Sequence, residues 1–431
     1  MTTSSTSATG SDRPRVAVIG SGVSGLTAAY VLRTTHDVTL FEADDRIGGH
    51  AHTHDVEADG TTHHVDSGFI VHNDRTYPLL RRLFAELDVA VHPTEMSMSI
   101  HCDGCGLEYA GGRKLPGLFA QRRRIVDPTY LRLLTSVKRF QRAALALLES
   151  EPDDAEPQTY GDFLRLHGFS GHFVAHYAIP VVACVWSSGQ DTALQYPARY
   201  LFAFLRHHGF LSVTGSPQWF TVQGGSNAYT RKVVEAIGDV RASTAVRAVS
   251  RKPDGVVVLD ASGQEHVVDS VVIATHADDA LALLTDATDD ERRVLGAFEY
   301  SRNETVLHQD ASVLPEAEGA RASWNYRMDS CEGRGEATDV TYWMNLLQGI
   351  ESSRPYLVSL NSSDRVDPTT VIATMQYTHP VYTPASVAAQ RELPTLSDGR
   401  TAFAGAYHGW GFHEDGCRSG VEAARSLGAT W

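Results

Sequence analysis

The sequence predicts an α/β protein of two domains, in which a parallel sheet and its helices are interrupted by inserted segments. Three observations lead to this prediction. The chain has 431 residues, and a chain of this length forms roughly two to three domains of about 150 residues. Near both ends, short apolar runs alternate with helix-like segments, as buried parallel strands require. Between the ends, the sequence changes to stretches rich in arginine, leucine and aromatic residues.

Composition and charge place the chain among folded proteins. Hydrophobic residues make up 42% and charged residues 21%, which excludes disorder, collagen and coiled coil. The 37 basic and 52 acidic residues leave a net charge of −15, so nucleic acid is not expected as a partner. Five scattered cysteines fit a reducing compartment better than a disulfide framework, and we expect a cytoplasmic protein.

A strand, a glycine-rich turn, a helix and a second strand follow one another near the N-terminus. The apolar run 16–19 has no polar alternation, as expected for a parallel strand covered on both faces. Residues 20–25 include three glycines and lead into 26–32, which has the apolar character of a buried helix. A second strand at 38–41 ends at Glu42. This order predicts one βαβ unit.

The three glycines stand where a dinucleotide-binding fold needs them. Gly20 permits the turn, Gly22 lets a pyrophosphate approach the backbone, and Gly25 lets the helix lie against the strand. The phosphates then meet free backbone N–H groups at the helix N-terminus. Glu42 follows Gly25 by 17 residues, where a carboxylate accepts hydrogen bonds from an adenosine ribose. The complete pattern predicts a bound dinucleotide rather than a purely structural turn.

The rest of the chain predicts that the two domains interrupt each other. Helical stretches fill 87–214, and strand-like runs dominate 299–382. Between these segments and again near the C-terminus, apolar runs typical of buried strands return. The Ser- and Thr-rich N-terminal residues lack the apolar stretch of a secretory signal or membrane anchor. The predicted parts are a disordered tail at 1–14, a nucleotide-binding domain at 15–86, 215–290 and 395–431, and a substrate domain at 87–214 and 291–394.

The residues after Glu42 indicate which dinucleotide to expect, because a simple NAD site needs no second glycine turn. Residues 43–50 read Ala-Asp-Asp-Arg-Ile-Gly-Gly-His. This string resembles the flavin-containing amine oxidase and phytoene desaturase superfamily, in which an arginine and a glycine pair pack against the FAD pyrophosphate. The resemblance implies a discontinuous Rossmann-type FAD-binding domain with an inserted substrate domain of mixed sheet and helices. Further matches to the superfamily lie in order at 65–68, 222–226, 403–405 and 416–424.

The same resemblance implies which residues hold FAD. Arg46 would be the counter-charge of the pyrophosphate, Val246 would meet the adenine through its backbone, and the strand 271–275 would lie beneath the cofactor. Residues 415–420 begin a helix whose positive end stabilises negative charge on the flavin. The predicted FAD-binding residues are Gly20, Gly22, Ser24, Gly25, Glu42, Ala43, Arg46, Gly49, His50, Gly68, Phe69, Val246, Thr275, Gly405, His413 and Gly416.

Departures from the amine oxidases weaken amine oxidation as the expected reaction. Many of those enzymes place a lysine so that it holds a water near flavin N5, but no lysine follows Lys252 here. Ala406 replaces an acidic residue beside the late glycine, and His50 replaces the arginine of a Gly-Gly-Arg string. No second glycine fingerprint for NADPH is present. Electrons are therefore expected to pass to oxygen or a soluble acceptor, or to return to the substrate.

More of the chain resembles a bacterial group of FAD-binding oxidoreductases that is similar to the N-terminal part of plant cyclopropane fatty acid synthases. This resemblance implies hydride transfer from an unsaturated fatty-acyl or other lipid-like substrate to flavin N5. A redox-neutral double-bond isomerase, a flavin amine oxidase and a non-catalytic FAD-bound partner of a lipid-modifying enzyme remain as alternatives. The matching segments are 66–71, 73–77, 342–345 and 411–416.

Two further segments predict contacts with the substrate. The loop at 407–414 is dense in aromatic and histidine residues, and its candidates for proton handling are Tyr407, His408, His413 and Glu414. The segment 113–142 carries nine basic residues and one acidic residue, interleaved with leucine and aromatic side chains. This pattern indicates peripheral contact with an anionic membrane, although a solvated basic face without a partner fits it equally.

No metal site is expected. His50, His52 and His54 alternate along the chain, but no cysteine or carboxylate stands near them at the spacing of a tetrahedral site. Cys102 and Cys105 have the spacing of a redox motif, yet the Asp-Gly between them and the strand-like flanks predict a hairpin turn.

Overall fold

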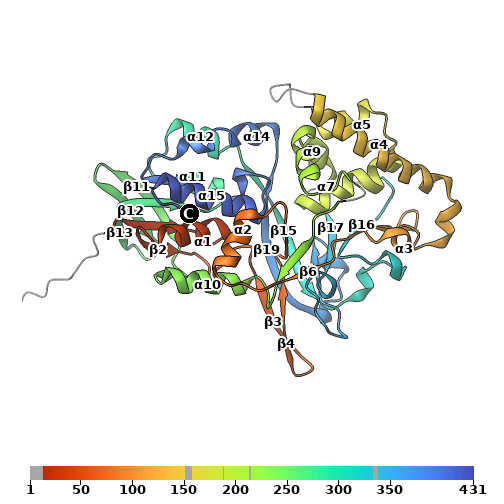
Figure 1. Ribbon diagram of the computed structural model, residues 1–431, viewed down its shortest axis with the longest axis horizontal. Coiled ribbons are helices and arrows are strands. Elements are labelled where there is room, and N and C mark those ends of the chain that lie inside the picture. The colour runs from red at the N-terminus through yellow and green to blue at the C-terminus, as the bar shows by residue number, and fades with distance from the viewer. Residues whose placement is uncertain (1–12, 151–157, 188, 213–214, 333–337) are drawn as a thin grey trace, which may run out of the picture. The chain divides into compact units, whose positions relative to one another are not determined.

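The computed structural model describes residues 13–150, 158–187, 189–212, 215–332 and 338–431. They form two compact units, each built from separate segments of the chain (Figure 1). Most of the tail predicted at 1–14 lies outside the described residues. The domain borders predicted from the sequence stay predictions. The first unit comprises Met1–Gly49, Thr230–Gly296 and Glu392–Trp431, and the second comprises His50–Tyr229 and Ala297–Arg391.

A parallel sheet of five strands forms the centre of the first unit. Its strand order is β10-β2-β1-β14-β20, and every neighbouring pair is parallel. The middle strands β1 and β14 are almost wholly buried because their apolar side chains are covered on both faces. The predicted α/β fold with a parallel sheet is confirmed. The strands are β1 (Arg15–Ile19), β2 (Asp37–Phe41), β10 (Val240–Arg241), β14 (Ser270–Ile273) and β20 (Thr401–Phe403).

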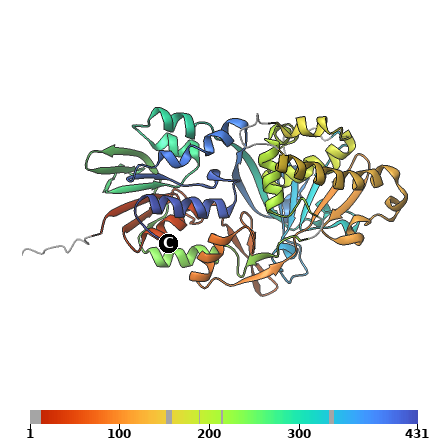
Figure 2. The ribbon, with the colours of Figure 1, turned by 45° about the horizontal axis from the view of Figure 1, so that its top comes forward.

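Helix α1 (Val23–Leu32) is buried at every position. It packs on β1, β2 and β14 and also on α15 (His413–Ser426). Figure 2 shows α15, in dark blue, alongside the red N-terminal elements. The other elements of this unit are α10 (Asn227–Ile237, from Thr230 on), β11 (Val246–Lys252), β12 (Gly255–Asp260), β13 (Glu265–Val268), α11 (Ala277–Leu283), α12 (Asp289–Leu295), η7 (Leu393–Leu396) and η8 (Ala406–His408).

A mixed sheet of seven strands is the framework of the second unit. Its order is β19-β15-β18-β17-β16-β7-β8, and β16 pairs with β7 in parallel whereas the other neighbours are antiparallel. The strands are β7 (Met98–Cys102), β8 (Leu107–Gly111), β15 (Glu299–His308), β16 (Trp324–Met328), β17 (Asp339–Trp343), β18 (Leu357–Leu360) and β19 (Val371–Val381).

Helices from the middle of the chain pack on this sheet, with α7 against β16 and β19 (Figure 2). Their common core is aromatic: the Phe140 ring lies 6.1 Å from that of Phe163 and 5.6 Å from that of Phe202. The helical elements are α3 (Lys114–Leu118), η1 (Arg122–Val126), α4 (Pro128–Ser150), α5 (Tyr160–Leu166), α6 (Gly171–Phe173), the π-helical turn η2 (Val174–Ala178), α7 (Ile179–Trp186), α8 (Gln190–Gln195) and α9 (Ala198–His207).

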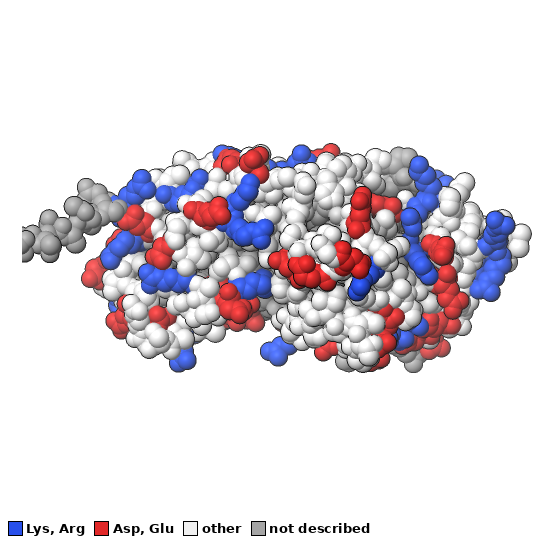
Figure 3. All heavy atoms as spheres, turned by 90° about the horizontal axis from the view of Figure 1, so that it is seen from below, with Lys and Arg blue, Asp and Glu red and all other residues white. Residues whose placement is uncertain are grey.

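Two small sheets complete the second unit, a β3-β4 hairpin and the three strands β5-β9-β6. Within the described part of the chain, no helix is both long and apolar enough to cross a membrane. On the face seen in Figure 3, basic and acidic side chains are interspersed. The remaining elements are β3 (Thr53–Ala58), β4 (Thr61–Asp66), β5 (Val71–Asn73), α2 (Pro78–Glu86), β6 (Val91–Thr94), β9 (Trp219–Val222), η3 (Ala311–Val313), η4 (Glu318–Ala320), α13 (Met344–Leu347), η5 (Ser363–Arg365), η6 (Pro368–Thr370) and α14 (Pro384–Gln390).

Candidate functional site

The turn between β1 and α1 contains two glycines that the fold requires and one that it does not. Gly20 has a φ of +97°, and a Cβ there would lie 2.8 Å from the carbonyl oxygen of Ala274. A Cβ on Gly25 would lie 1.9 Å from the carbonyl oxygen of Gly20. A Cβ on Gly22 would meet no atom within 4 Å. The turn therefore leaves open space at Gly22, where a phosphate group fits against backbone N–H groups.

Glu42, at the end of β2, lies beside this turn. Its Oε2 accepts hydrogen bonds from the backbone N–H and the hydroxyl of Ser21, at 2.8 and 2.6 Å. Its Oε1 accepts the backbone N–H of Asp44 at 2.9 Å. A carboxylate has about four acceptor positions, so Glu42 retains capacity for ribose hydroxyls. The carboxylate is held in place before any ligand binds.

The second glycine turn packs directly on the first. The backbone N–H of Gly48 donates to the Ser21 hydroxyl at 3.0 Å. Gly49 has a φ of +57°, and a Cβ there would lie 3.0 Å from the Cα of Gly22. Arg46 forms an ion pair of 3.7 Å with Asp44 and is 25% exposed. Glycines that lie far apart in the sequence thus surround one space.

Helices α1 and α15 bring their N-terminal ends to the same side of the first unit. A Cβ on Gly416 would lie 2.6 Å from Cγ1 of Val23, and one on Gly420, a turn later, would lie 3.1 Å from the backbone nitrogen of Ala28. These contacts advance together along both helices, so the helices run parallel. Each N-terminus carries the equivalent of about half a positive charge, and together they favour an anionic ligand.

Asp415 organises the loop that leads into α15. Its Oδ2 accepts the backbone N–H groups of Trp410 at 3.0 Å and Phe412 at 3.1 Å, and its Oδ1 pairs with Arg418 at 2.6 Å. Burial raises the pKa of the Asp415 carboxyl, although Arg418 lowers it. Because these bonds satisfy N–H groups before the first turn, α15 begins at His413, earlier than the segment 415–420 in which the sequence predicted its start.

The predicted catalytic residues fall into two adjacent elements of the first unit. Tyr407 and His408 lie in η8 with their rings 4.8 Å apart, whereas His413 and Glu414 lie in the first turn of α15. Burial lowers the pKa of His408 to about 3, with a smaller contribution from Arg418. Burial also raises the pKa of Tyr407. Both side chains are uncharged at neutral pH.

His408 supplies a second test of whether a cofactor fits this unit. Its Nε2 is buried, yet it has no hydrogen-bond partner among the described residues. A buried polar atom of this kind costs about 1–3 kcal/mol unless something pairs with it. The unpaired His408 nitrogen and the open space at Gly22 are both features expected of a protein that binds a cofactor in this unit.

The remaining predicted FAD-binding residues of the first unit lie near the glycine turn, at the start of a strand, or in the segments around α1 and α15. The Thr275 methyl group lies 3.5 Å from the position of a Cβ on Gly20. Val246 begins β11, and the pairing of β11 with β12 is irregular directly after it. Ser24 is buried in α1, Ala43 is exposed, and the backbone N–H of Gly405 donates to the Ser419 hydroxyl at 2.9 Å.

Three predicted FAD-binding residues belong to the second unit, where they lie together. The backbone N–H of Phe69 donates to the carbonyl of His50 at 2.6 Å. A Cβ on Gly68 would lie 2.1 Å from the same oxygen, so only glycine fits there. The His50 ring lies 5.0 Å from the ring of Tyr377 and 5.3 Å from that of His379.

Asp66 joins two of the sequence segments that resemble the flavoprotein superfamily. Its buried carboxylate accepts the hydroxyl of Thr53 at 2.6 Å, the backbone N–H of Ser226 at 2.8 Å and the side-chain amide of Gln348 at 2.8 Å. Burial raises the pKa of Asp66 to about 6, against these hydrogen bonds. The sequence contained this residue in a matched segment but assigned it no role. The available signal was an acidic residue inside a segment that matches the superfamily.

A parallel sheet, two packed glycine turns and a carboxylate at the end of the second strand are the features of a dinucleotide-binding fold of the FAD type. The chain belongs to the family of flavin-containing amine oxidoreductases, whose model matches residues 23–303. FAD is therefore its cofactor, as the sequence predicted, and the family is one of oxidoreductases.

Curated relatives match parts of the chain. The putative flavin-containing monoamine oxidase AofH of Mycobacterium tuberculosis is 28% identical over 259 residues, which are 58% of this chain and 54% of AofH. The L-amino-acid oxidase of Pseudechis australis is 51% identical over 51 residues, 12% of this chain and 10% of that enzyme. The chain thus spans about half or less of the length of these relatives.

Solved structures match nearly the whole chain in fold. Cyclohexylamine oxidase from Brevibacterium oxydans aligns with a TM-score of 0.67 and 16% identity, covering 96% of this chain and 98% of that one. The CLA-producing fatty acid isomerase from P. acnes aligns with a TM-score of 0.66 and 17% identity, covering 95% and 97%. At these identities the likeness establishes the fold alone.

Proposed function

We propose that this flavoprotein takes a hydride from an unsaturated fatty-acyl or similarly apolar, lipid-like substrate. The observation that carries the proposal is the uncharged segment before α15, where Tyr407 and His408 are both neutral at pH 7. Asp415 lies in the first turn of α15, directly after this segment. It is buried, and Arg418 neutralises its charge in an ion pair. Neutral aromatic and imidazole groups suit an apolar chain, because a charged lining would have to be desolvated.

The lysine distribution supports the same proposal. No lysine follows Lys252, so the downstream segments lack the side chain that holds a water near the flavin in many amine oxidases. Ala406 likewise replaces an acidic residue. The resemblance to the cyclopropane fatty acid synthase-like group and the fold shared with a fatty acid isomerase are consistent with an acyl substrate.

The residues of the first unit have distinct proposed roles. When bound, FAD supplies the hydride acceptor. The turn at Gly22 and the N-terminal ends of α1 and α15 hold its pyrophosphate and stabilise negative charge. His408, with a pKa of about 3, holds a proton poorly at neutral pH, so it serves as a neutral hydrogen-bonding group. We assign uptake of the substrate proton to His413 or Glu414.

A flavin amine oxidase is the second candidate function, because the match to AofH is the longest of the sequence matches described above. Two other outcomes differ in electron flow. A redox-neutral isomerase would return the hydride to another carbon of the same chain, and a non-catalytic partner of a lipid-modifying enzyme would leave the flavin oxidised. Electrons from a net oxidation would pass to oxygen or a soluble acceptor.

Anaerobic titration of the purified yellow protein separates these functions. Unsaturated fatty acids and phospholipids are added in one series and simple primary amines in another, and flavin absorbance is followed by stopped flow. We expect fast bleaching by the acyl series alone, followed by recovery when oxygen is admitted. Recovery without oxygen would establish the isomerase, and bleaching by amines with release of hydrogen peroxide would replace the proposal by amine oxidation. A flavin that no lipid or amine reduces would overturn it in favour of the non-catalytic role.

We also propose that the segment 113–142 contacts an anionic membrane surface. Leu115, Ile125 and Val126 are 68%, 54% and 81% exposed, and they stand among exposed arginines such as Arg122 and Arg123. Exposed apolar side chains with basic neighbours are typical of an interfacial membrane site.

We propose a cytoplasmic location as well. None of the five cysteines forms a disulfide bond, as is usual for proteins of a reducing compartment.

A further inference from the structure

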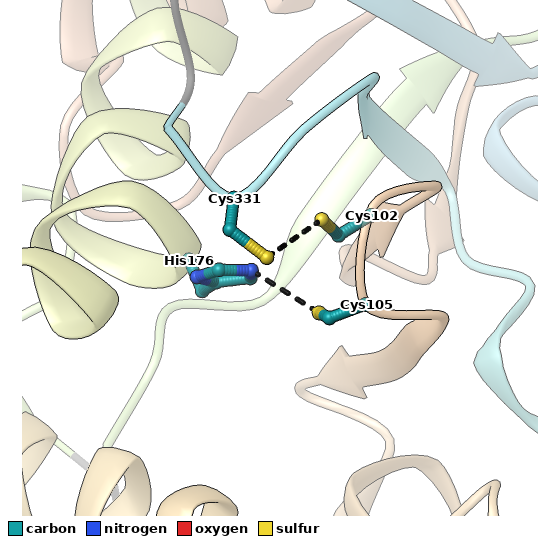
Figure 4. Close-up of side chains that lie close together, drawn as sticks. All are labelled: Cys102, Cys105, His176 and Cys331. Atoms are coloured by element: carbon teal, nitrogen blue, oxygen red, sulfur yellow. Dashed lines mark hydrogen bonds between the residues drawn. The ribbon is translucent and has the colours of Figure 1, made fainter.

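Four side chains of types that commonly bind metals, three cysteines and one histidine, lie together in the second unit. Cys102 ends β7 and Cys105 follows in the turn before β8, while His176 lies in η2 and Cys331 follows β16. Their ligand atoms all lie within 4.8 Å of one another. Figure 4 shows the four side chains directed toward a common centre from three separate segments of the chain.

The spacing of these atoms matches a tetrahedral zinc site. Zn–S bonds of about 2.3 Å and Zn–N bonds of about 2.0–2.1 Å place two sulfurs about 3.8 Å apart and a sulfur and a nitrogen about 3.6 Å apart. The sulfurs of Cys102 and Cys331 are 3.8 Å apart. The Cys105 sulfur lies 3.5 Å from Nε2 of His176. Both separations are edges of the tetrahedron that zinc requires.

His176 is oriented as a metal ligand. The side chain is fully buried, and its Nδ1–H donates to the carbonyl of His172 at 2.9 Å. This bond fixes the neutral tautomer in which Nε2 carries a free lone pair, and Nε2 is the atom that points toward the cysteines. A backbone carbonyl in this position is the usual second partner of a ligating histidine. The π-helical turn η2, a form common at functional sites, places the ring there.

The backbone around the cysteines is held independently of any metal. A Cβ on Gly104 would lie 2.9 Å from Cα of Ser330, so this glycine lets the hairpin turn approach the loop that carries Cys331. The Arg124 guanidinium donates to the carbonyl of Cys105 at 3.0 Å. Arg327 donates to Asp103 of the same turn at 3.0 Å. The pairing of β7 with β8 confirms the predicted hairpin, and this hairpin also provides two of the four candidate ligands.

We propose that Cys102, Cys105, His176 and Cys331 bind one zinc ion that joins the β7-β8 hairpin, η2 and the loop after β16. Three thiolates and one imidazole fill all four tetrahedral positions, which is the ligand set of a structural site without an open position for catalysis. Soft thiolate ligands also select zinc over magnesium or calcium. The expectation of no metal considered the histidines near residue 50 and did not connect these four residues. The proposed site does not depend on the proposed reaction.

Metal analysis of the full-length holoprotein, purified without chelators, tests the site. We expect inductively coupled plasma mass spectrometry to find about one zinc ion per chain in the wild type. Cys105→Ser and Cys331→Ser should each lower the zinc content at least about tenfold. Cys184→Ala, which removes a buried cysteine of α7 that is not one of the four, should keep the zinc. Replacement by Co²⁺ should give thiolate-to-cobalt charge-transfer absorption and the strong visible bands of a tetrahedral site.

Three results would overturn the proposal. The first is a wild-type protein without zinc that also gives no thiolate-to-cobalt absorption. The second is an intact mass lighter by two hydrogen atoms together with a linked Cys102–Cys331 peptide, which would establish a disulfide instead. The third is bound iron or copper in place of zinc. The wild-type cobalt spectrum decides the question even where a variant fails to fold, and flavin reduction by substrates is measured separately.

Discussion

At the scale of single residues, the glycines of the turn after β1 differ in why they are needed: two are required by the fold, and one leaves space for a ligand. Gly20 and Gly25 are required because a Cβ at either position would meet backbone at less than 3 Å. Gly22 meets no such obstacle, since its missing side chain faces open space. If the FAD pyrophosphate lies there, as the sequence predicts, a side chain at this position would collide with the cofactor alone.

Gly22→Ala should therefore reduce FAD binding without harming the fold. The φ of −62° at Gly22 is accessible to alanine, so we expect the melting temperature of the apoprotein to stay within about 2 °C of wild type. The FAD dissociation constant should rise at least about tenfold, because the added methyl group occupies the phosphate position. Fluorescence titration of apoprotein with FAD measures this change.

Two further variants make the test specific. Gly171→Ala also adds a methyl group in open space, at the start of α6 in the second unit, and should leave FAD affinity unchanged. Gly25→Ala should lower both FAD affinity and stability, because its Cβ would strike the Gly20 carbonyl. Wild-type affinity in Gly22→Ala would show that the phosphates do not lie against this residue.

At the scale of elements, the first βαβ unit was predictable because its signals are local. The signals follow one another within one supersecondary unit: an apolar run, the glycines, the helix and Glu42. A steric or hydrogen-bonding requirement explains why each stands at its position. The structure places Glu42 and Gly49 at the glycine turn, where the sequence put FAD. Their contact with FAD stays a prediction.

Elements whose position depends on distant contacts were less predictable. The start of α15 depends on Asp415, which bonds N–H groups upstream of itself. The cluster of Cys102, Cys105, His176 and Cys331 is assembled from three segments, and only the Cys-x-x-Cys spacing was visible locally. A single sequence does not show which histidine the fold brings to such a pair.

The exposed segment of α3, η1 and α4 leads to a prediction at the same scale. The double variant Arg122→Gln with Val126→Asp should bind anionic phosphatidylserine vesicles at least about tenfold more weakly than wild type. Each basic residue near such a surface contributes about 1 kcal/mol, and a buried valine contributes about as much or more. Sedimentation with vesicles measures the effect, and neutral vesicles should bind all variants weakly.

Leu166→Asp is the matched control for this prediction. Leu166 is 74% exposed in α5, outside the basic segment, so Leu166→Asp adds the same single negative charge as Val126→Asp to an apolar site elsewhere. It should leave vesicle binding unchanged. Equal binding of the double variant and the wild type would mean that the basic face is merely solvated, as the sequence also allowed.

At the scale of the whole molecule, buried histidines set the response to acid. Burial lowers the pKa of His72, His208 and His308 to about 4, and that of His408 to about 3. The ordinary pKa of histidine is about 6.5. Between these values, the unfolded chain binds protons that the folded chain excludes. Each of these histidines therefore lowers stability as the pH falls from about 6.5 toward 4.

Two carboxyls, one buried and one largely buried, act in the opposite direction. Burial raises the pKa of Asp66 and Asp339 to about 6, above the ordinary value of about 4. The folded chain then binds protons that the unfolded chain does not, so these groups gain stability over the same pH range. The four histidines outweigh the two carboxyls, because they are more numerous and because their pKa values lie further from the ordinary value. The net effect of acid is destabilising.

His308 isolates one part of this acid response. Its Nε2 lies 2.8 Å from the Ser359 hydroxyl, and its Nδ1 accepts the backbone N–H of Asp310 at 3.1 Å, which protonation would abolish. The glutamine amide also offers N–H donors and an acceptor oxygen, and it does not take up a proton in this pH range. In urea unfolding followed by circular dichroism, wild-type stability should fall from pH 6.5 to 4, and His308→Gln should remove up to about 3 kcal/mol of that fall. His167→Gln, at an exposed position, should leave the slope unchanged. A wild-type stability that is flat or rising toward pH 4 would mean that the buried histidines accept protons in the folded state.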